Sequence, residues 1–424
     1  MNRNVLETPM PGIFEVNARA AACRQAGAAL INLGQAVPFF GPPDYAVQAW
    51  RPLLESTALH RYSPDPGLPG LRNAWASLLG TLDGRPVDSE REMLITAGAN
   101  GAYLTAVLAL LDPGDRMGLL TPFYFNHAMA VRMAGGEVVE IPVRPADGYQ
   151  PDPDEVLRIA VDQGLKAVTL VNPNNPTGAT WAPERVWAMA KGLTDRGILV
   201  VSDETYRFFP DPHVEFQAAG SVEEHPDRII TIGSFSKTFG ITGWRVGYLT
   251  AAAPLIAQMV KVHDTMVICA PTPGQRLVQA CLEGPWEAWL ADRRADLDWR
   301  MGMVRKAGPM LGTWRVGVVG RFFAWLDGPG PKDDLDAERA LLAAGASRAA
   351  GGPAGSPTPG SVAGPPATLA RAMVNRLMDG QGLVMIPGDI FGRGWDRSLR
   401  LSLGGTSGED LAEGLQRLQL GLSG

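Results

Sequence analysis

The stretch GSFSKTFGITGWR, residues 233–245, places a lysine among small hydroxyl residues, directly after an apolar run. The amine of Lys237 can form a Schiff base with an aldehyde once burial or nearby cations lower its pKa. Ser234, Ser236 and Arg245 surround it, and two hydroxyls with a guanidinium suit a phosphate group. An amine for an aldehyde beside a clamp for a phosphate describes one ligand, pyridoxal 5′-phosphate (PLP).

A carboxylate and two hydrogen-bond donors complete that description. Asp203, in VSDETY, can form an ion pair with the pyridine nitrogen of PLP and so keep the ring protonated as an electron sink. Tyr206 follows three residues later, and Asn175 stands in the Asn-Pro turn of VNPNNPTG. Both side chains can donate to the phenolic oxygen of the cofactor and thereby tune the pKa of the Schiff base.

Two weaker motifs point the same way. TAGANGA, residues 96–102, is a turn into a helix, and the first backbone amides of that helix, at Ala99 and Asn100, suit a phosphate. Tyr124, in TPFYFNH, is placed to stack on the pyridine ring, and His127 fits either a place near the ring or the core. Each motif alone has a simpler structural explanation, but their joint occurrence after successive apolar runs predicts PLP binding.

The elements that must position these residues follow a regular alternation from about residue 94. Short apolar runs are separated by amphipathic helical patterns, which predicts an α/β fold with a mostly parallel sheet covered by helices on both faces. Ligands of such sheets bind outside the carboxyl ends of the strands, where the motif residues fall. The predicted strands cover residues 93–96, 116–120, 137–143, 167–172, 197–203, 228–233 and 246–250.

Three parts are expected along the chain. Residues 1–45 form an N-terminal arm that belongs to the smaller domain, 46–305 form the large PLP-binding domain, and 306–424 form a smaller α+β domain. The stretch at 344–366, rich in Gly, Ala, Ser and Pro, is predicted to be a flexible surface loop. The other elements expected near the C-terminal end are a connecting helical stretch at 275–308, a hairpin at 314–327, a helix at 367–380, strands at 382–387 and 398–403, and a closing helix from 408.

Composition excludes several classes of function. The net charge of −6 argues against a nucleic-acid partner, which needs a basic face. No run approaches the roughly 18 apolar residues of a membrane span, and the N-terminus lacks the apolar segment of a signal peptide. The three cysteines are few, odd in number and without metal-ligand spacing, so neither disulfides nor a metal site is expected. A reducing compartment, the cytoplasm, fits best.

The sequence resembles the class I and II aminotransferases of PLP fold type I over nearly its whole length. NPNNPTG, SDETY and SFSKTFGITGWRVGY match the motifs of that family almost letter for letter and in the same order. The resemblance implies that Lys237 holds PLP as an internal aldimine and shuttles a proton, and that Asp203 pairs with the ring nitrogen. It also implies that Asn175 and Tyr206 contact the phenolic oxygen and that Tyr124 stacks on the ring. The phosphate is then held by Ala99, Asn100, Ser234, Ser236 and Arg245.

Further positions of the family bear on substrate and assembly. Arg400, in RLSL, matches the residue that binds the substrate α-carboxylate through a bidentate pair. Gly34 matches a backbone contact to the same carboxylate, and the surrounding LGQAVPFFGPP is similar to the kynurenine and glutamine aminotransferase subgroup. Tyr62 matches a tyrosine that contacts the phosphate of the neighbouring subunit, which implies a homodimer with shared active sites.

The expected reaction is transamination between amino and keto acids, through the Lys237 aldimine and a quinonoid intermediate. An alternative keeps every cofactor residue: a lyase, cyclase or β- or γ-replacement enzyme similar to 1-aminocyclopropane-1-carboxylate synthase. A PLP-sensing regulator ranks last, because the arm is too short and the chain too acidic for a DNA-binding domain. The aromatic residues Phe39, Phe40 and Tyr124 favour a large or apolar substrate, although core packing accounts for them equally well.

Overall fold

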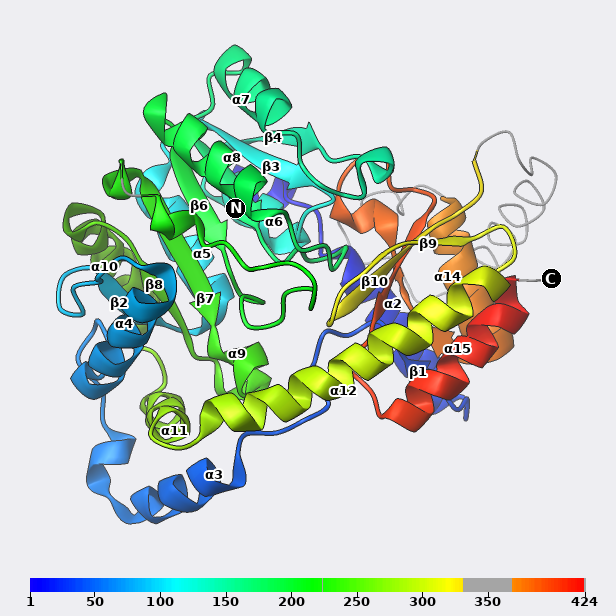
Figure 1. The fold of residues 1–424 in the computed structure, drawn as a ribbon, viewed down its shortest axis with the longest axis horizontal. Helices are drawn as coiled ribbons and strands as arrows, with labels where there is room; N and C mark the ends of the chain where they lie inside the picture. The colour runs from blue at the N-terminus through cyan, green and yellow to red at the C-terminus, as the bar shows by residue number, and fades with distance from the viewer. Residues whose placement is uncertain (223, 331–367, 423–424) are drawn as a thin grey trace.

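The computed structural model describes residues 1–222, 224–330 and 368–422 of the chain. The low-complexity stretch predicted at 344–366 lies outside the described residues. Figure 1 shows two bodies, one built around a large sheet and one around a small sheet, which a long helix, α12 (Trp286–Ala307), connects.

The large sheet has seven strands in the order β2-β8-β7-β6-β5-β3-β4. Strand β8 runs antiparallel to both of its neighbours, and all other pairs are parallel. The prediction of an α/β fold with a mostly parallel sheet is therefore confirmed. The strands are β2 (Met93–Thr96), β3 (Arg116–Thr121), β4 (Glu137–Pro142), β5 (Ala167–Val171), β6 (Leu199–Asp203), β7 (Ile229–Ser234) and β8 (Gly247–Thr250).

Helices cover both faces of this sheet because successive strand residues point to opposite sides. Val201 packs into one buried cluster with α5, whereas its neighbour Val200 packs into another with α8. Both positions need an apolar side chain, which is why the central strands show continuous apolar runs. Figure 1 shows α8 in front of the sheet and α5 behind it. The covering helices are α5 (Gly98–Leu110), α6 (Phe125–Met133), α7 (Pro153–Asp162), α8 (Pro183–Asp195) and α10 (Ala253–Val267).

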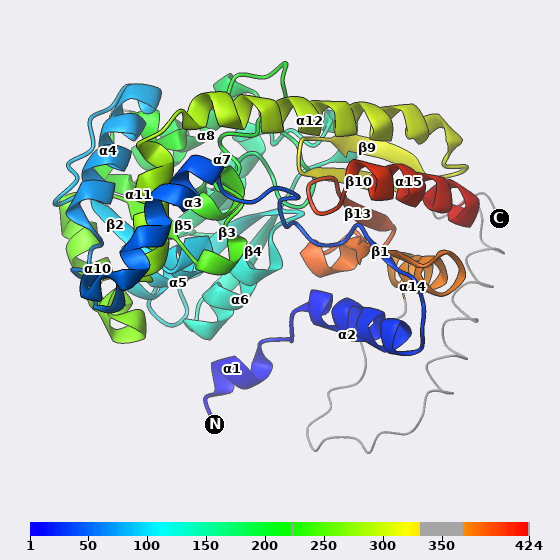
Figure 2. The same ribbon diagram turned by 90° about the horizontal axis from the view of Figure 1, so that it is seen from below.

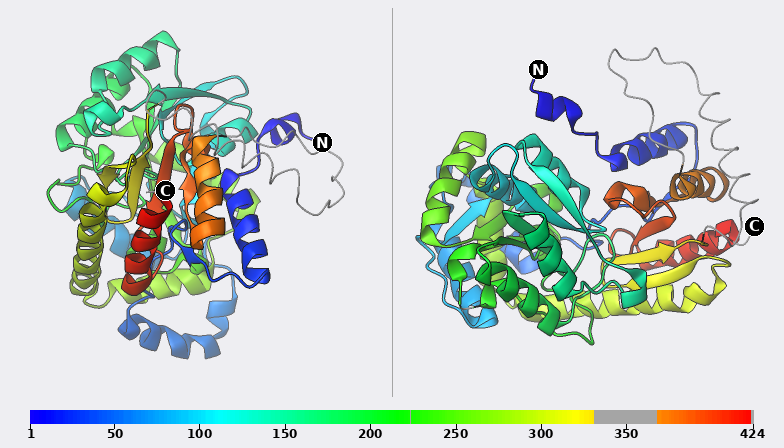
Figure 3. Two further views of the ribbon diagram at one scale, coloured as in Figure 1. Left: turned by 90° about the vertical axis from the view of Figure 1, so that its right-hand side faces the viewer. Right: turned by 90° about the horizontal axis from the view of Figure 1, so that it is seen from above.

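The second body contains a four-stranded antiparallel sheet in the order β12-β13-β10-β9. The N-terminal arm joins it, because β1 (Ile31–Asn32) pairs in parallel with β11 (Leu383–Val384). Figure 3 shows α2, α14, α15 and α12 standing side by side around this sheet. The elements are α2 (Gly12–Gln25), β9 (Arg315–Val319), β10 (Phe323–Asp327), α14 (Leu369–Gln381), β12 (Ile386–Pro387), β13 (Ser398–Ser402) and α15 (Gly408–Leu422), and α1 (Arg3–Glu7) precedes them.

Two predicted elements are divided in the structure. The helical stretch expected at 275–308 is two helices, α11 (Thr272–Leu282) and α12, because Pro285 lacks the amide hydrogen that a continuous helix needs. The preceding Gly284 is packed so closely that an added Cβ would lie 2.1 Å from the ring of Tyr45. The strand expected at 382–387 is also divided, since β11 and β12 belong to different sheets.

The long helix α12 spans both bodies, as Figure 2 shows from below. Helices α3 (Asp44–Trp50) and α4 (Pro69–Asp83) both contact α11, and α4 also contacts β2 at the edge of the large sheet. Among the helices that the structure describes, none combines the length and the apolar character that a membrane crossing would need. The carboxyl ends of β5, β6 and β7 face the small sheet, and the cavity described next lies there.

Candidate active site

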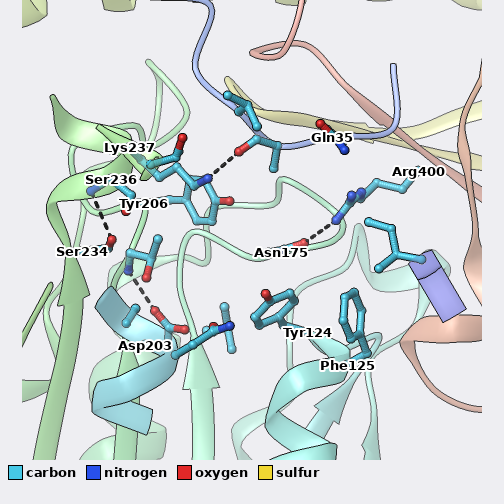
Figure 4. Close-up of a pocket in the computed structure, with 18 of the residues that line it drawn as sticks. Gln35, Tyr124, Phe125, Asn175, Asp203, Tyr206, Ser234, Ser236, Lys237 and Arg400 are labelled. Carbon is cyan, nitrogen blue, oxygen red and sulfur yellow. Dashed lines mark hydrogen bonds between the residues drawn. The ribbon is translucent and has the colours of Figure 1, made fainter. Parts of the chain in front are cut away.

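A cavity of about 260 Å³ lies where the large sheet meets the small one. Figure 4 shows its lining, with Ser234 and Ser236 on one side and Arg400 on the other. All but two of the residues predicted for the site line it: Ala99, Asn100, Tyr124, Asn175, Asp203, Tyr206, Ser234, Ser236, Lys237, Arg245 and Arg400. The cavity is also lined by residues outside the predicted set, namely Ile13, Gln35, Ala36, Val37, Phe125, Val171, Thr205 and Thr242.

Lys237 lies in the short helix α9 (Phe235–Thr238), which begins where β7 ends. The Ser234 side chain caps that helix by accepting a hydrogen bond from the Ser236 amide at 3.1 Å. The Lys237 amine donates to the carbonyl oxygen of Ala36. Burial, together with the charges of Arg400 and Arg245, lowers the pKa of Lys237 to about 8. A substantial share of this amine is therefore uncharged near neutral pH and can act as a nucleophile.

The groups of the predicted phosphate clamp meet at the N-terminal end of α9, where Ser234 is the capping residue. Within the described chain, the Ser236 hydroxyl is buried without a hydrogen-bond partner, and no side chain caps the N-terminus of α5. Gly98, at φ +75°, lets the Arg245 guanidinium lie against that terminus, because an added Cβ would stand 2.4 Å from Arg245 Nη2. Donors without an acceptor, beside a guanidinium whose Nη1 donates to the Thr242 carbonyl at 2.9 Å, make this corner a binding site for an anion.

Asp203 ends β6 with its carboxylate in the floor of the cavity. Its Oδ1 accepts from the Thr205 amide at 3.0 Å, and its Oδ2 lies 3.1 Å from Nε2 of His127. Burial by itself would raise the pKa of Asp203, but the hydrogen bonds from His127 and Thr205 outweigh it and the pKa is lowered. The carboxylate therefore stays charged and can hold a cationic ring nitrogen.

His127 is the residue whose place the sequence left open, and it lies against Asp203. Its ring stacks on Tyr103 at 3.9 Å between centroids, and the Tyr103 hydroxyl in turn lies 2.8 Å from that of Thr169. A signal for this position exists in the sequence, since His127 follows Tyr124 by three residues at the start of α6 and so shares its face of the helix. The pattern alone does not reveal the carboxylate on the other side.

Arg400 approaches the cavity from β13 of the small sheet. Its guanidinium donates to Asn175 Oδ1 at 2.9 Å and to the Gly34 carbonyl at 2.7 Å, and its Nε has no partner within the described chain. The rings of Phe323 and Phe391 lie 4.8 and 5.0 Å from it, and burial lowers the pKa of Arg400 to about 10. A carboxylate entering here would meet a partly dehydrated cation with a free donor.

Two predicted residues do not line the cavity. Both backbone polar groups of Gly34 are engaged within the chain, the carbonyl with Arg400 and the amide with Asn32 Oδ1 at 2.9 Å. Tyr62 is 76% exposed and lines a separate open hollow with Val267 and Cys269. The roles of Gly34 at the substrate and of Tyr62 at a neighbouring subunit stay predictions.

PLP fits this set of residues. The buried Ser236 hydroxyl and the N-terminus of α5 lack acceptors that a phosphate would supply, and the charged Asp203 carboxylate in the floor of the cavity suits a cationic ring nitrogen. Tyr124 and Tyr206 also line the cavity, and burial raises the pKa of each, so both hydroxyls keep their protons and can donate.

Comparisons with known proteins agree with this fit. The model of the family "Aminotransferase class I and II" matches residues 28–418. The chain is 32% identical to aromatic aminotransferase ISS1 of Arabidopsis thaliana, over 80% of this chain and 85% of that protein. It is also 32% identical to kynurenine–oxoglutarate transaminase 1 of Homo sapiens, over 60% and 63%.

Among solved structures, aspartate aminotransferase from Thermus thermophilus with maleate superposes with a TM-score of 0.84. It is 28% identical, and the match covers 100% of this chain and 99% of that one. These findings favour an aminotransferase over the lyase and cyclase alternatives that the sequence left open. The chain therefore belongs to the class I and II aminotransferase family and is a PLP-dependent enzyme with an aminotransferase's chemistry.

Proposed function

We propose that the residues of this cavity carry an amino-group transfer between an α-amino acid and a keto acid. The observation that supports it is the convergence of three groups on one cavity: the Lys237 amine of low pKa, the charged Asp203 carboxylate and the Arg400 guanidinium with a free donor. Each comes from a different element, so their meeting requires the whole fold.

PLP, when bound, supplies an electron-withdrawing ring to a substrate attached at its aldehyde carbon. Lys237 would hold that carbon and Asp203 the ring nitrogen, with Tyr124 on the ring face and Asn175 and Tyr206 at the phenolic oxygen. The phosphate would lie among Ala99, Asn100, Ser234, Ser236 and Arg245.

The chain's own residues then divide the work on the substrate. Arg400 fixes the α-carboxylate, which turns the Cα–H bond to one side of the cavity. The Lys237 Nζ, once free, would be the base that takes the proton from Cα and returns it on the other side of the amino nitrogen, at the cofactor's aldehyde carbon. When the amine is not bonded to the cofactor, its hydrogen bond to the Ala36 carbonyl holds it in a defined position beside the substrate.

Incubation of the PLP-loaded protein with an amino donor alone tests this proposal. In the absence of a keto acid, an aminotransferase stops after half a cycle, with the amino group on the cofactor, and the absorbance moves to shorter wavelength. We expect this conversion to be stoichiometric and to reverse when a keto acid is added. A lyase or cyclase would instead leave the absorbance of the lysine-linked cofactor unchanged while it releases product, which would contradict the proposal.

His127 provides a second test, because it acts on the reaction through Asp203. His127→Phe keeps a ring to stack on Tyr103 but removes the donor to the carboxylate. Loss of that donor raises the pKa of Asp203, so the acid limb of the pH–rate profile should move to higher pH. His127→Asn, which restores a donor, should move it back. A profile unchanged from that of the exposed control His213→Phe would contradict the role.

We further propose a homodimer with shared active sites, in which Tyr62 contacts the partner's phosphate site. The exposure of Tyr62 supports it, as do the large apolar side chains exposed nearby, Met266, Val267 and Ile268. The domain limits at 45 and 305–306 are proposed from the two sheets, and a cytoplasmic location from the three free cysteines.

A further inference from the structure

Four of the lining residues that have no part in the functions assigned so far are Ile13, Gln35, Val37 and Phe125. Ile13 lies in the first turn of α2, Phe125 begins α6, and Gln35 and Val37 lie in the loop after β1. Figure 4 shows Gln35 and Phe125 on the Arg400 side of the cavity, away from Ser234 and Ser236. A substrate whose carboxylate is held by Arg400 therefore projects its side chain among these four residues.

Each cationic side chain of the cavity wall already has a role in the proposed function. Its cationic side chains among the described residues are Lys237, Arg245 and Arg400, which the proposed function assigns to the cofactor aldehyde, the phosphate and the α-carboxylate. No cation of this set remains for a second carboxylate. An acidic side chain entering here would lose its water without gaining a partner charge.

A guanidinium behind the Ile13 end of the wall is also engaged. Arg371 lies behind Gly12, with Nη2 3.6 Å from the position of an added Cβ. Its Nη1 donates to Glu15 at 2.7 Å and its Nε donates to Asp389. With two carboxylates on one guanidinium, Arg371 has no net positive charge to offer to a substrate.

The apolar part of the wall is fixed in place by packing. Gly12 lies so close to Ile390 that an added Cβ would stand 2.3 Å from its Cγ2, which sets the start of α2 and the position of Ile13. The ring of Phe125 lies 4.9 Å from that of Tyr124 and 6.2 Å from that of Phe391. Ile13 and Phe125 both pack against the main buried cluster, so the surface that they form is a preformed apolar pocket.

We propose that the substrates of this enzyme are α-amino acids and 2-oxo acids with apolar side chains, and that Ile13, Val37 and Phe125 select them. The inference rests on the proposed function, since it needs Arg400 at the α-carboxylate. Phe39 and Phe40 do not take part: Phe39 lies under the guanidinium of Arg300 at 3.9 Å, and Phe40 lies against Trp289 at 5.4 Å.

The first experiment uses the PLP-loaded protein and two sets of amino donors. L-phenylalanine and L-leucine should convert the cofactor at least about tenfold faster, per molar, than L-aspartate and L-glutamate. Titration with unreactive acids gives a readout without turnover: 3-phenylpropanoate should bind at least about tenfold more tightly than succinate. Faster reaction of the dicarboxylates would overturn this inference alone, whereas failure of every donor to convert the cofactor would overturn the proposed function.

A charge introduced into the pocket makes the test specific. Ile13→Lys should improve succinate binding and weaken 3-phenylpropanoate binding, each by about tenfold. Phe14→Lys is the matched control, because Phe14 is the next residue of α2, is 60% exposed and does not line the cavity. If both variants change the two affinities alike, Ile13 does not face the substrate. The comparison of the two acids on the unsubstituted protein stands even if Ile13→Lys fails to fold.

Discussion

Lys237→Ala should abolish the absorbance of the lysine-linked cofactor and lower turnover by more than about 10⁴-fold. The loss is large because one side chain has two tasks, the covalent link and the movement of the Cα proton, and removal of a general base alone costs about 10²–10⁴. PLP added to the variant should bind through its phosphate and ring contacts but show the spectrum of the free aldehyde. Absorbance spectra and single-turnover rates measure both effects.

Lys261→Ala is the matched control for this substitution. Lys261 lies exposed on α10, where its amine donates to Gln258, and it should be replaceable with no change in spectrum or rate. A Lys237→Ala protein that keeps the lysine-linked spectrum would show that another amine holds the cofactor, and the assignment of the site would then be wrong.

The low pKa of Lys237 adds a pH dependence that can be measured on the cofactor-free protein. Burial favours the uncharged amine, and with a pKa of about 8 roughly one molecule in ten is uncharged at pH 7. An ordinary lysine would have about one in three thousand uncharged. The rate of reconstitution with PLP should therefore rise from pH 6 to about pH 8 and level off above it, whereas an unperturbed amine would give a rise that continues past pH 10.

Much of the fold was predictable because the core imposes simple patterns. Strands buried on both faces require continuous apolar runs, and each run predicted from 93 to 250 coincides with a strand of the large sheet to within three residues at either end. The errors fall where tertiary packing decides. Gly284 and Pro285 separate α11 from α12, and the chain passes from one sheet to another between Val384 and Ile386.

The candidate site was predictable to the extent that its residues lie in motifs. Residues near Lys237, Asp203 and Asn175 are constrained by local turns, so their spacing is visible in the sequence. Ile13 and Arg400 are almost 390 residues apart and enter the same cavity from different elements of the smaller body. Ile13 has no motif around it, and its role depends on a helix whose position only the folded chain defines.

Replacement of Asp203 tests whether a negative charge at the ring nitrogen is needed for removal of the Cα proton. Asp203→Ala should leave part of the cofactor bound but slow the exchange of the Cα proton by about 10²–10³-fold or more. Without the carboxylate, the ring nitrogen has no anion to keep it protonated, and the ring withdraws the charge that develops at Cα less well. The measurement is deuterium incorporation at Cα of the amino donor, scaled to the amount of bound cofactor.

Asp203→Asn separates charge from structure. Asparagine keeps a side-chain oxygen that can accept the hydrogen bond from the Thr205 amide, which Asp203 Oδ1 accepts at 3.0 Å, but it carries no charge. If the charge matters, Asn should be as slow as Ala in proton exchange although it preserves the loop. Asp195→Asn, at an exposed aspartate paired with Lys191, should exchange at the unsubstituted rate. An Asp203→Asn protein with normal exchange would mean that the carboxylate only shapes the loop, because the ring would then withdraw electrons without an anion at its nitrogen.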